Sequence, residues 1–239
     1  MIEWRPPGPY RVAFTTRVGG VSTGPFESLN LGILTEDDPA HVVENRRRAC
    51  AAIGADAATA TMAWQHHSAE VARADGRGIL TPGTPFERCD GLWSEQPGRA
   101  MMLLTADCLP VAIARADGER PALAVLHVGW RGLLSGIVGS GAAALGGRRL
   151  MAAIGPGIGP CCYEVRDDVA DPFRARFGSG VVGGRKLDLW HAAEHALRAA
   201  GCESVERTDL CTFCHPQLLF SHRRDRGRTG RQGVVGYVT

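Results

Sequence analysis

The chain has 239 residues, of which 44% are hydrophobic and 22% are charged, and its 27 basic and 25 acidic residues give a formal net charge of +2. This apolar content is sufficient for a folded core and excludes an intrinsically disordered protein, and the charge balance excludes binding of nucleic acid through a general basic excess. The 31 glycines have no three-residue period, which excludes a collagen-like fibre.

The N-terminal part of the chain predicts one strand and one helix. Apolar residues alternate with polar ones over residues 10–16, which predicts a strand, and a glycine-rich loop follows it. Asp38 followed by Pro39 is typical of a helix start, because Asp caps the first turn and Pro fits into it. We expect this helix to run to about Ile53 and to end at Gly54.

The rest of the chain predicts buried strands with two helices among them. A small-residue helix is expected over residues 132–145, a second helix over 187–200 ends at Gly201, and residues 234–238 predict a C-terminal strand. Near-continuous apolar runs predict strands covered on both faces at residues 101–104, 111–114, 122–128 and 150–154. Because strands and helices mix without strict alternation, we predict an α/β fold, a single domain over residues 1–239 with mixed stacked β-sheets flanked by helices.

No run of about 20 apolar residues, the length that a membrane-spanning helix needs, occurs in the sequence. The N-terminal residues also lack the basic segment and apolar stretch of a secretory signal. We therefore expect a cytoplasmic protein without a membrane partner, in which the eight cysteines stay reduced. Reduced cysteines in a chain of this size are packing residues, metal ligands or nucleophiles.

One cysteine-rich string, Cys211-Thr-Phe-Cys214-His215, matches the attachment sequence for c-type haem. Haem attachment takes place outside the cytosol, so the expected location argues against it. A zinc ribbon would need a second matching pair, and the adjacency of Cys161 and Cys162 predicts poor geometry for one ion. We therefore interpret Cys161 and Cys162 as packing residues.

A second string, His191-Ala-Ala-Glu194-His195, matches the inverted zinc-protease motif. At 100° per residue, the apolar face of this helix is centred near Ala193, and both histidines fall on the opposite side. This geometry predicts a polar helix face turned to solvent instead of a metal site.

Multicopper oxidases build their copper cluster from His-x-His pairs, and the sequence contains none. The supply of ligands therefore argues against laccase chemistry. We expect negligible oxidation of phenolic dyes unless copper is added.

Three further residues, His67, Cys108 and His127, form a dispersed set of candidate metal ligands. His67 follows a short apolar stretch, and Cys108 and His127 stand at the ends of two expected strands. Strand ends that meet at one edge of a sheet are common places for a site. Two imidazoles and a thiolate suit a catalytic zinc ion with one open position. Spacing alone leaves open that the three are unrelated buried residues.

Seven strings, at residues 14–22, 28–32, 65–67, 105–110, 127–132, 154–165 and 220–231, occur in the order typical of one family. They resemble the bacterial purine nucleoside phosphorylases once called polyphenol-oxidase laccases and also described as peptidoglycan editing factors, and the resemblance covers nearly the whole chain. One departure adds a competing ligand, because His66 stands where the family has Val. Neighbouring side chains of an extended segment point to opposite faces, so only one of His66 and His67 would reach the ion.

The resemblance implies an α/β fold with stacked sheets and one zinc ion bound by His67, Cys108 and His127, a site that could also take copper in vitro. It implies phosphorolysis of adenosine, inosine, guanosine and S-methyl-5′-thioadenosine to the free base and ribose or methylthioribose 1-phosphate. It also implies adenosine deamination as a second activity. The partners expected are therefore purine nucleosides and phosphate.

Phosphorolysis needs fixed cations for phosphate, and Arg17, Arg46 and Arg131 are the candidates, with Asn30 as a further substrate contact. Cys108 and His127 would act in catalysis through the zinc. A general acid or base must stand beside them, and the candidates are the two carboxylates Asp107 and Glu164.

The residues are also compatible with two other classes of enzyme. A zinc hydrolase acting on peptidoglycan precursors could use the same ligands, and a thiol hydrolase could use Cys108 as nucleophile with His127 as base. A third hypothesis is a binding protein that catalyses no reaction. Chelation separates the first two, because it should leave a thiol enzyme active.

Overall fold

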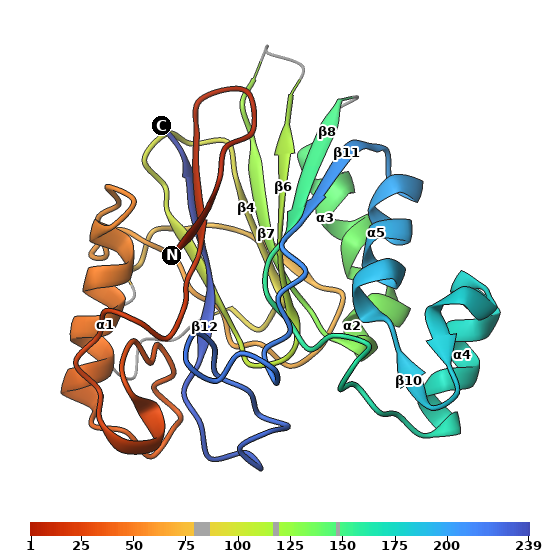
Figure 1. Cartoon of the computed structure of the whole chain (residues 1–239). Coiled ribbons are helices and arrows are strands. Elements are labelled where there is room, and N and C mark those ends of the chain that lie inside the picture. The colour runs from red at the N-terminus through yellow and green to blue at the C-terminus, as the bar shows by residue number, and fades with distance from the viewer. Residues whose placement is uncertain (79–86, 117–119, 147–148) are drawn as a thin grey trace.

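The computed structural model describes residues 1–78, 87–116, 120–146 and 149–239, and its strands form two principal sheets between helices (Figure 1). The larger sheet has six strands in the order β11-β8-β6-β7-β4-β3, and the smaller has four in the order β1-β2-β12-β5. The larger sheet consists of β3 (Val71–Arg73), β4 (Gly91–Ser94), β6 (Leu109–Arg115), β7 (Leu123–Val128), β8 (Leu150–Ile154) and β11 (Cys202–Arg207). The smaller consists of β1 (Ile2–Trp4), β2 (Tyr10–Phe14), β5 (Met101–Thr105) and β12 (Gln232–Val238).

The larger sheet is mixed, and the smaller is antiparallel. Strand β6 runs antiparallel to both β7 and β8, whereas β8 is parallel to β11 and β3 is parallel to β4. Every pair in the smaller sheet is antiparallel. A further short pair, β9 (Val182–Gly183) with β10 (Lys186–Leu187), lies outside both sheets.

The helices cover the outer faces of the two sheets. Helix α1 (Pro39–Ala51) lies on the side of the smaller sheet, and α2 (Trp130–Ser135), α3 (Ile137–Leu145) and α5 (Leu189–Ala199) lie on the side of the larger sheet (Figure 1). Helix α4 (Asp167–Phe177) packs beside α2 and α5. Two short 3₁₀ turns, Gly24–Phe26 and Ser179–Val181, complete the described elements.

Three clusters of buried apolar side chains explain why the strands consist of nearly continuous apolar residues. On β7, Ala124 and Leu126 face the helices, and Leu123 and Val125 face the smaller sheet. Successive side chains of a strand alternate in direction, so a strand covered on both sides needs apolar residues at every position. Leu126 is fully buried, and truncating such a residue to Ala costs about 2–5 kcal/mol. A third cluster lies between α1 and the smaller sheet.

The predicted α/β fold with mixed stacked sheets and flanking helices is confirmed. The side chain of Asp38 accepts a hydrogen bond from the Ala40 N–H, so it caps α1 as the Asp-Pro pair predicted. Asp188 caps α5 in the same way, through the N–H of His191.

Several predicted boundaries were wrong. The predicted helix over residues 132–145 is two helices, because Gly136 takes a left-handed conformation with φ of 97° between α2 and α3. The strand predicted over residues 10–16 ends at Phe14. The short strands β1, β3, β4 and β11 and helix α4 were not predicted. Helix α4 contains Pro172, which normally marks a helix end.

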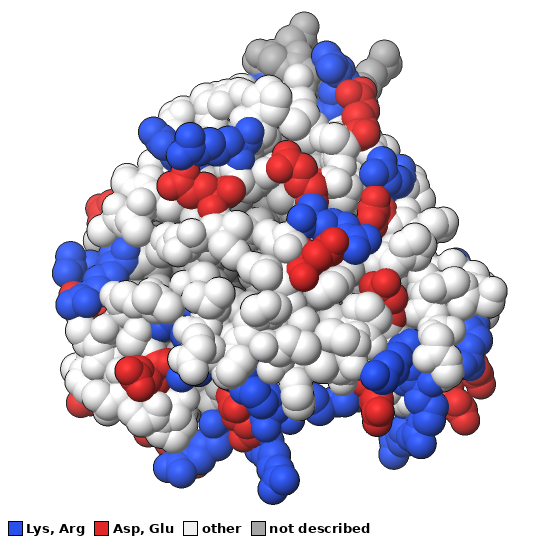
Figure 2. Space-filling view, viewed as in Figure 1, with Lys and Arg blue, Asp and Glu red and all other residues white. Residues whose placement is uncertain are grey.

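Basic and acidic side chains are interspersed over the face of the molecule seen in Figure 1, as Figure 2 shows. This distribution accords with the near-balanced charge of the sequence. Among the described residues, none of the helices has the length and apolar character that crossing a membrane requires.

Candidate metal centre and its cavity

The fold brings His67, Cys108 and His127 together. Their ligand atoms all lie within 4.8 Å of one another. Cys108 directly precedes β6, and His127 is near the end of β7, where it lies opposite Pro110 in the antiparallel register. The start of one strand and the end of its neighbour therefore share one edge of the sheet. His67 reaches that edge from a loop.

Asp90 holds both histidines of this group and is fully buried. Its carboxylate accepts hydrogen bonds from the backbone N–H groups of His66, His67 and Ser68, at 3.2, 2.9 and 2.6 Å. The Nδ1 atom of His127 lies 2.7 Å from the same carboxylate. A histidine whose Nδ1 is held by a carboxylate presents Nε2 to a metal, so Asp90 orients the ligand. Asp90 was missed, because it stands in none of the matching strings.

The loop conformation at the site is strained. His67 has φ of 64° and Asp107 has φ of 89°, values that residues other than glycine rarely adopt. A Cβ atom on Gly129 would lie 3.0 Å from Cys108 Sγ and 3.0 Å from His67 Cδ2. The close convergence of the three ligands therefore leaves little room for a side chain at position 129.

The electrostatics favour a thiolate at Cys108. Burial opposes ionisation of this thiol, but the charges of His127 and His67 and their hydrogen bonds outweigh it and lower the pKa of Cys108 to about 6. Burial likewise disfavours the imidazolium of His127, yet the Cys108 thiolate and Asp90 raise the pKa of His127 to about 9. Two imidazoles and a thiolate around one point are the donor set that a catalytic zinc or copper ion takes.

The ligand group lies in the wall of a cavity of about 480 Å³. Trp64 and Tyr163 contribute aromatic surface, and Arg46 and Arg231 contribute guanidinium groups. The remaining wall is formed by Gly32, Ile33, Leu34, Thr35, Met62, Ala63, Gln65, Leu104, Thr105, Ala106, Asp107, Ile158, His222 and Arg223. A mainly apolar cavity with a few convergent polar groups is typical of a small-molecule site.

The predicted phosphate-binding residues separate into two groups. Arg46 lines the cavity, and its Nε donates to the carbonyl of Leu31 at 2.9 Å. Burial lowers the pKa of Arg46 to about 10. Asn30 lies behind the wall, fully buried, and its side-chain oxygen accepts from the N–H of Arg231 at 2.8 Å.

Arg17 and Arg131 are placed away from the cavity wall. The guanidinium of Arg17 donates to the carbonyls of Glu27 and Pro216, at 2.6 and 2.7 Å, and so holds two loops together. The guanidinium of Arg131 lies over the ring of its neighbour Trp130, 4.2 Å from the centroid.

The two predicted carboxylates also differ in placement. Asp107 lines the cavity beside Cys108, and its carboxylate accepts from Thr212 Oγ1 and from the N–H of Arg223, each at 2.6 Å. Glu164 is exposed and lies outside the cavity wall. Arg231 and Tyr163 belong to matching strings but were not selected, because nothing in a string tells which of its members reaches a cavity.

The histidines of α5 are exposed, as the helix geometry predicted. Glu194 between them pairs with Arg198 and Arg207 at 2.9 and 2.8 Å. Of the residues that the structure describes, two groups gather three or more metal-ligand side chains, and neither includes these histidines.

Comparison with known proteins decides the family. Residues 11–238 match the family model described as multi-copper polyphenol oxidoreductase laccase. The chain belongs to this family. A Pseudomonas aeruginosa member named purine nucleoside phosphorylase is 38% identical over 241 residues, covering 96% of this chain and 93% of that protein. The Escherichia coli protein YfiH, also named purine nucleoside phosphorylase, is 34% identical over 237 residues, covering 96% of this chain and 94% of its own.

Solved structures of the family share the fold. The Bacillus licheniformis hypothetical protein YfiH superposes with a TM-score of 0.89 at 31% identity, covering 96% of this chain and 93% of that one. YlmD from Geobacillus stearothermophilus gives a TM-score of 0.83 at 31% identity, covering 95% and 91% of the two chains. The recognition of the family from its seven strings is confirmed.

Proposed function

We propose that this chain is a zinc-dependent purine nucleoside phosphorylase that acts on adenosine, inosine, guanosine and S-methyl-5′-thioadenosine, with adenosine deamination as a second activity. The observation that carries the proposal is the His67, Cys108 and His127 group in the wall of a cavity that also holds guanidinium groups and aromatic surface. The names of the relatives point to the same activity.

The three ligands fit zinc in number and in kind. Catalytic zinc sites use three protein ligands and keep a fourth position for water or substrate, and this group opens onto a cavity. Zinc bound there supplies a Lewis acid that polarises an oxygen atom or ionises water near neutral pH. The carboxylate of Asp90 gives His127 the outer partner that zinc-binding histidines usually have.

Arg46 and Arg231 are the residues that we assign to phosphate. Both guanidinium groups are tied to backbone carbonyls, Arg46 to Leu31 and Arg231 to Thr229 and Gly230, so their positions are fixed before phosphate enters. A fixed guanidinium binds a phosphate oxyanion without losing further side-chain freedom. Asn30 acts as a positioning residue through its hydrogen bond to the Arg231 N–H.

The reaction then needs a place for the purine and a proton for it. A phosphate oxygen forms a bond to C1′ of the ribose while the bond from C1′ to the purine nitrogen breaks, and the electron pair stays on the purine. Trp64 and Tyr163 offer aromatic surface for the base. Asp107 lines the cavity beside Cys108, and we assign to it the transfer of a proton to the purine as it leaves.

A thiol hydrolase is the second candidate, because the lowered pKa of Cys108 and the raised pKa of His127 describe a thiolate with an imidazolium beside it. The two functions differ in their need for metal and for phosphate. If the protein is a zinc-dependent phosphorylase, Cys108 is a metal ligand and is shielded from thiol reagents.

The deciding experiment incubates the purified protein with inosine or adenosine, with and without phosphate, before and after chelation. We expect hypoxanthine and ribose 1-phosphate from inosine only in the presence of phosphate, and recovery of a chelated sample when zinc is restored. Adenosine in phosphate-free buffer should yield inosine if deamination is the second activity. Equal release of base without phosphate would show a hydrolase, and full activity after complete removal of metal would favour the thiol enzyme.

The arginine assignment has its own test in a pair of neighbouring residues. Arg46→Gln should raise the KM for phosphate by about tenfold, since a charge-assisted hydrogen bond contributes about 1.5–3 kcal/mol. Arg47 is exposed on the same helix and pairs with Glu44, so Arg47→Gln is the matched control and should leave this KM unchanged. An unchanged KM in both variants would remove Arg46 from the phosphate site.

A further inference from the structure

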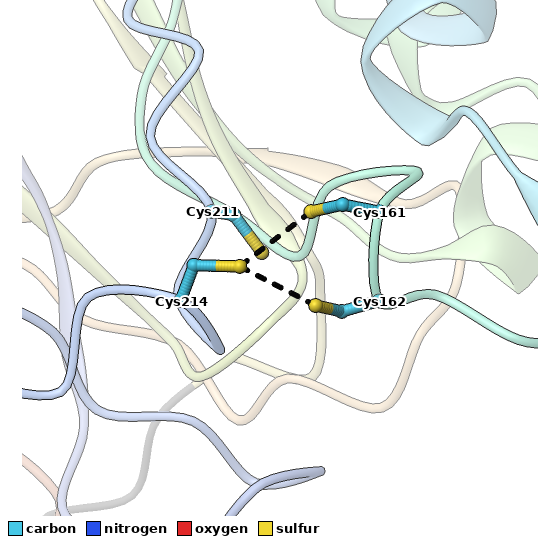
Figure 3. Close-up of side chains that lie close together, drawn as sticks. All are labelled: Cys161, Cys162, Cys211 and Cys214. Carbon is cyan, nitrogen blue, oxygen red and sulfur yellow. Dashed lines mark hydrogen bonds between the residues drawn. The ribbon is translucent and has the colours of Figure 1, made fainter.

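Four cysteines that the proposed function does not use lie together at one end of the larger sheet (Figure 3). Cys161 and Cys162 come from the loop that follows β8, and Cys211 and Cys214 come from the loop that follows β11. The four sulfur atoms all lie within 4.8 Å of one another. Cys214 Sγ is 3.6 Å from Cys161 Sγ and 3.4 Å from Cys162 Sγ.

These separations suit a single metal ion. Four sulfurs arranged tetrahedrally at the usual zinc–sulfur distance are roughly 3.8 Å apart. In an iron–sulfur cluster the thiolates bind different iron atoms, so their sulfurs stand further apart than ligands that share one ion. The cysteines therefore match a mononuclear site better than a cluster.

The adjacency of Cys161 and Cys162 does not prevent convergence, so the expectation of poor geometry was wrong. The N–H groups of Cys162 and Tyr163 both donate to the carbonyl of Gly159 at 3.0 Å, which winds this segment into a tight turn. In such a turn consecutive side chains are about 100° apart, whereas in a strand they point to opposite faces. Cys161 is also exposed, which contradicts its interpretation as a packing residue.

The second loop carries the backbone arrangement of a thiolate site. The N–H of Gly159 donates to Cys211 Sγ at 3.3 Å, and the N–H groups of Phe213 and Cys214 also face this sulfur. Donors of this kind neutralise part of the charge of a metal-bound thiolate and fix its direction. The Cys-x-x-Cys spacing is the spacing that structural zinc sites use.

We propose that Cys161, Cys162, Cys211 and Cys214 bind a second zinc ion, at a structural site separate from the His67, Cys108 and His127 centre. Four protein ligands fill the coordination of zinc and leave no position for substrate. Four thiolates and one Zn²⁺ carry a net negative charge. Lys186, the only lysine of the chain, donates from Nζ to the carbonyl of Cys161 at 2.7 Å and places a positive charge beside the site.

The site would clamp the loops that form part of the nucleoside cavity. Ile158 and Tyr163, which line the cavity, flank the first cysteine pair. Thr212, inside the second pair, donates from Oγ1 to Asp107 at 2.6 Å, and Gly157 forms a bridge with Cys211. A zinc ion across the two loops would therefore hold one wall of the cavity without touching substrate.

Metal analysis of the full chain tests the proposal without reference to nucleoside activity. Protein produced with zinc and purified without chelator should hold one zinc ion at each site. Cys214→Ser should lose half of the zinc, and His127→Ala should lose the other half. Cys202→Ala changes a buried cysteine outside both groups and should keep all of it.

A folded Cys214→Ser protein with as much zinc as the unsubstituted chain would overturn the proposal. So would a disulfide between Cys214 and Cys161 or Cys162 in freshly purified protein that holds only one zinc. If Cys214→Ser does not fold, cobalt-loaded His127→Ala decides the question. Strong thiolate-to-cobalt charge-transfer absorption in that variant supports a four-cysteine site, and its absence contradicts one.

Discussion

The two thiol-containing groups of this protein differ in donors, surroundings and charge. The centre at Cys108 combines one thiol with two imidazoles, is backed by the buried carboxylate of Asp90, and opens onto a cavity. The cluster at Cys211 has four thiols and lies near the surface, with Cys161 and Cys214 exposed. These differences suit the first group to the proposed catalytic ion and the second to the proposed structural ion.

The pKa values of the thiols express the same difference. Imidazole neighbours offset the burial of Cys108 and lower its pKa to about 6. In the cluster, burial and hydrogen bonds with the thiols of Cys211 and Cys214 raise the pKa of Cys161 to about 11. At Cys211 the effect of burial is outweighed by the hydrogen bond from the Gly159 N–H, which lowers the pKa of this one thiol. A thiol beside potential cations ionises by itself, whereas thiols beside one another need a metal ion to ionise together. The comparison therefore predicts different responses to substitution, pH and metal removal.

The largest expected effect follows from removal of a ligand of the proposed catalytic centre. His127→Ala should lower kcat/KM for inosine by about 1000-fold or more, because a catalytic metal contributes several kcal/mol to the transition state. His67→Ala should likewise lose zinc from this centre. His66 lies outside the ligand group, with its ring 3.7 Å from Glu70 and 3.6 Å from Asp90, so His66→Ala is the control and should keep both metal and activity. Loss of zinc in His66→Ala instead would exchange the roles of the two neighbouring histidines.

Asp90→Asn should have the next largest effect, on metal affinity more than on the chemical step. Loss of the carboxylate weakens the orientation of His127 and of the loop at His67, and outer partners of this kind contribute about 10- to 100-fold to affinity. Competition with a zinc indicator measures the change. The control is Glu95→Gln, since Glu95 forms an exposed ion pair with Arg73. Equal zinc affinity in Asp90→Asn and the parent protein would contradict the role of Asp90.

Alkylation of metal-free protein should separate the two kinds of thiol by pH. The lowered pKa of Cys108 means that its thiolate dominates above about pH 6, so its labelling rate should rise through that pH. Cys161, with a pKa raised to about 11, should react slowly until far more alkaline pH. Site-resolved mass spectrometry follows both.

The same pair has a stability consequence in metal-free protein. The contribution of Cys108, whose pKa is lowered, is lost as pH falls through about 6, and the contribution of His127, whose pKa is raised, is lost as pH rises through about 9. Because the contribution of Cys108 grows over the same pH range in which that of His127 fades, the two nearly cancel, and this pair should make the thermal stability of metal-free protein change little between about pH 6 and 9. A Cys108 labelling profile centred near pH 9 would contradict the interaction with the imidazoles.

The smallest expected effect concerns glycine 129. Gly129→Ala brings a Cβ atom to 3.0 Å from Cys108 Sγ and from His67 Cδ2, so a ligand must move, and zinc affinity should fall by about tenfold, or 1.4 kcal/mol. Gly139 lies in α3, and a Cβ atom added there would have no neighbour within 4 Å. Gly139→Ala should therefore leave zinc affinity unchanged and stabilise the fold by up to about 1 kcal/mol. Chemical unfolding and zinc competition measure the pair.

The sequence by itself predicted the buried strands, the cap of α1 and the positions of the candidate ligands along the chain. Apolar runs must be covered on both faces wherever they lie, and Asp38 caps α1 through the N–H of Ala40, two residues further along the chain. Cys108 and His127 could be found from sequence because they stand at ends of such strands. His67 was a candidate because it follows a short apolar stretch, and the family strings then favoured the three residues as one set.

Only the tertiary structure decided which groups surround those ligands. Asp90 reaches His127 across 37 residues, and Arg17 and Arg231 belong to similar loop strings, yet only Arg231 lines the cavity. The convergence of Cys161 and Cys162 on Cys214 depends on a turn closed by the carbonyl of Gly159 and on a loop about 50 residues further along the chain. Patterns along a chain report local conformation and burial, whereas the direction of a loop side chain is set by long-range hydrogen bonds.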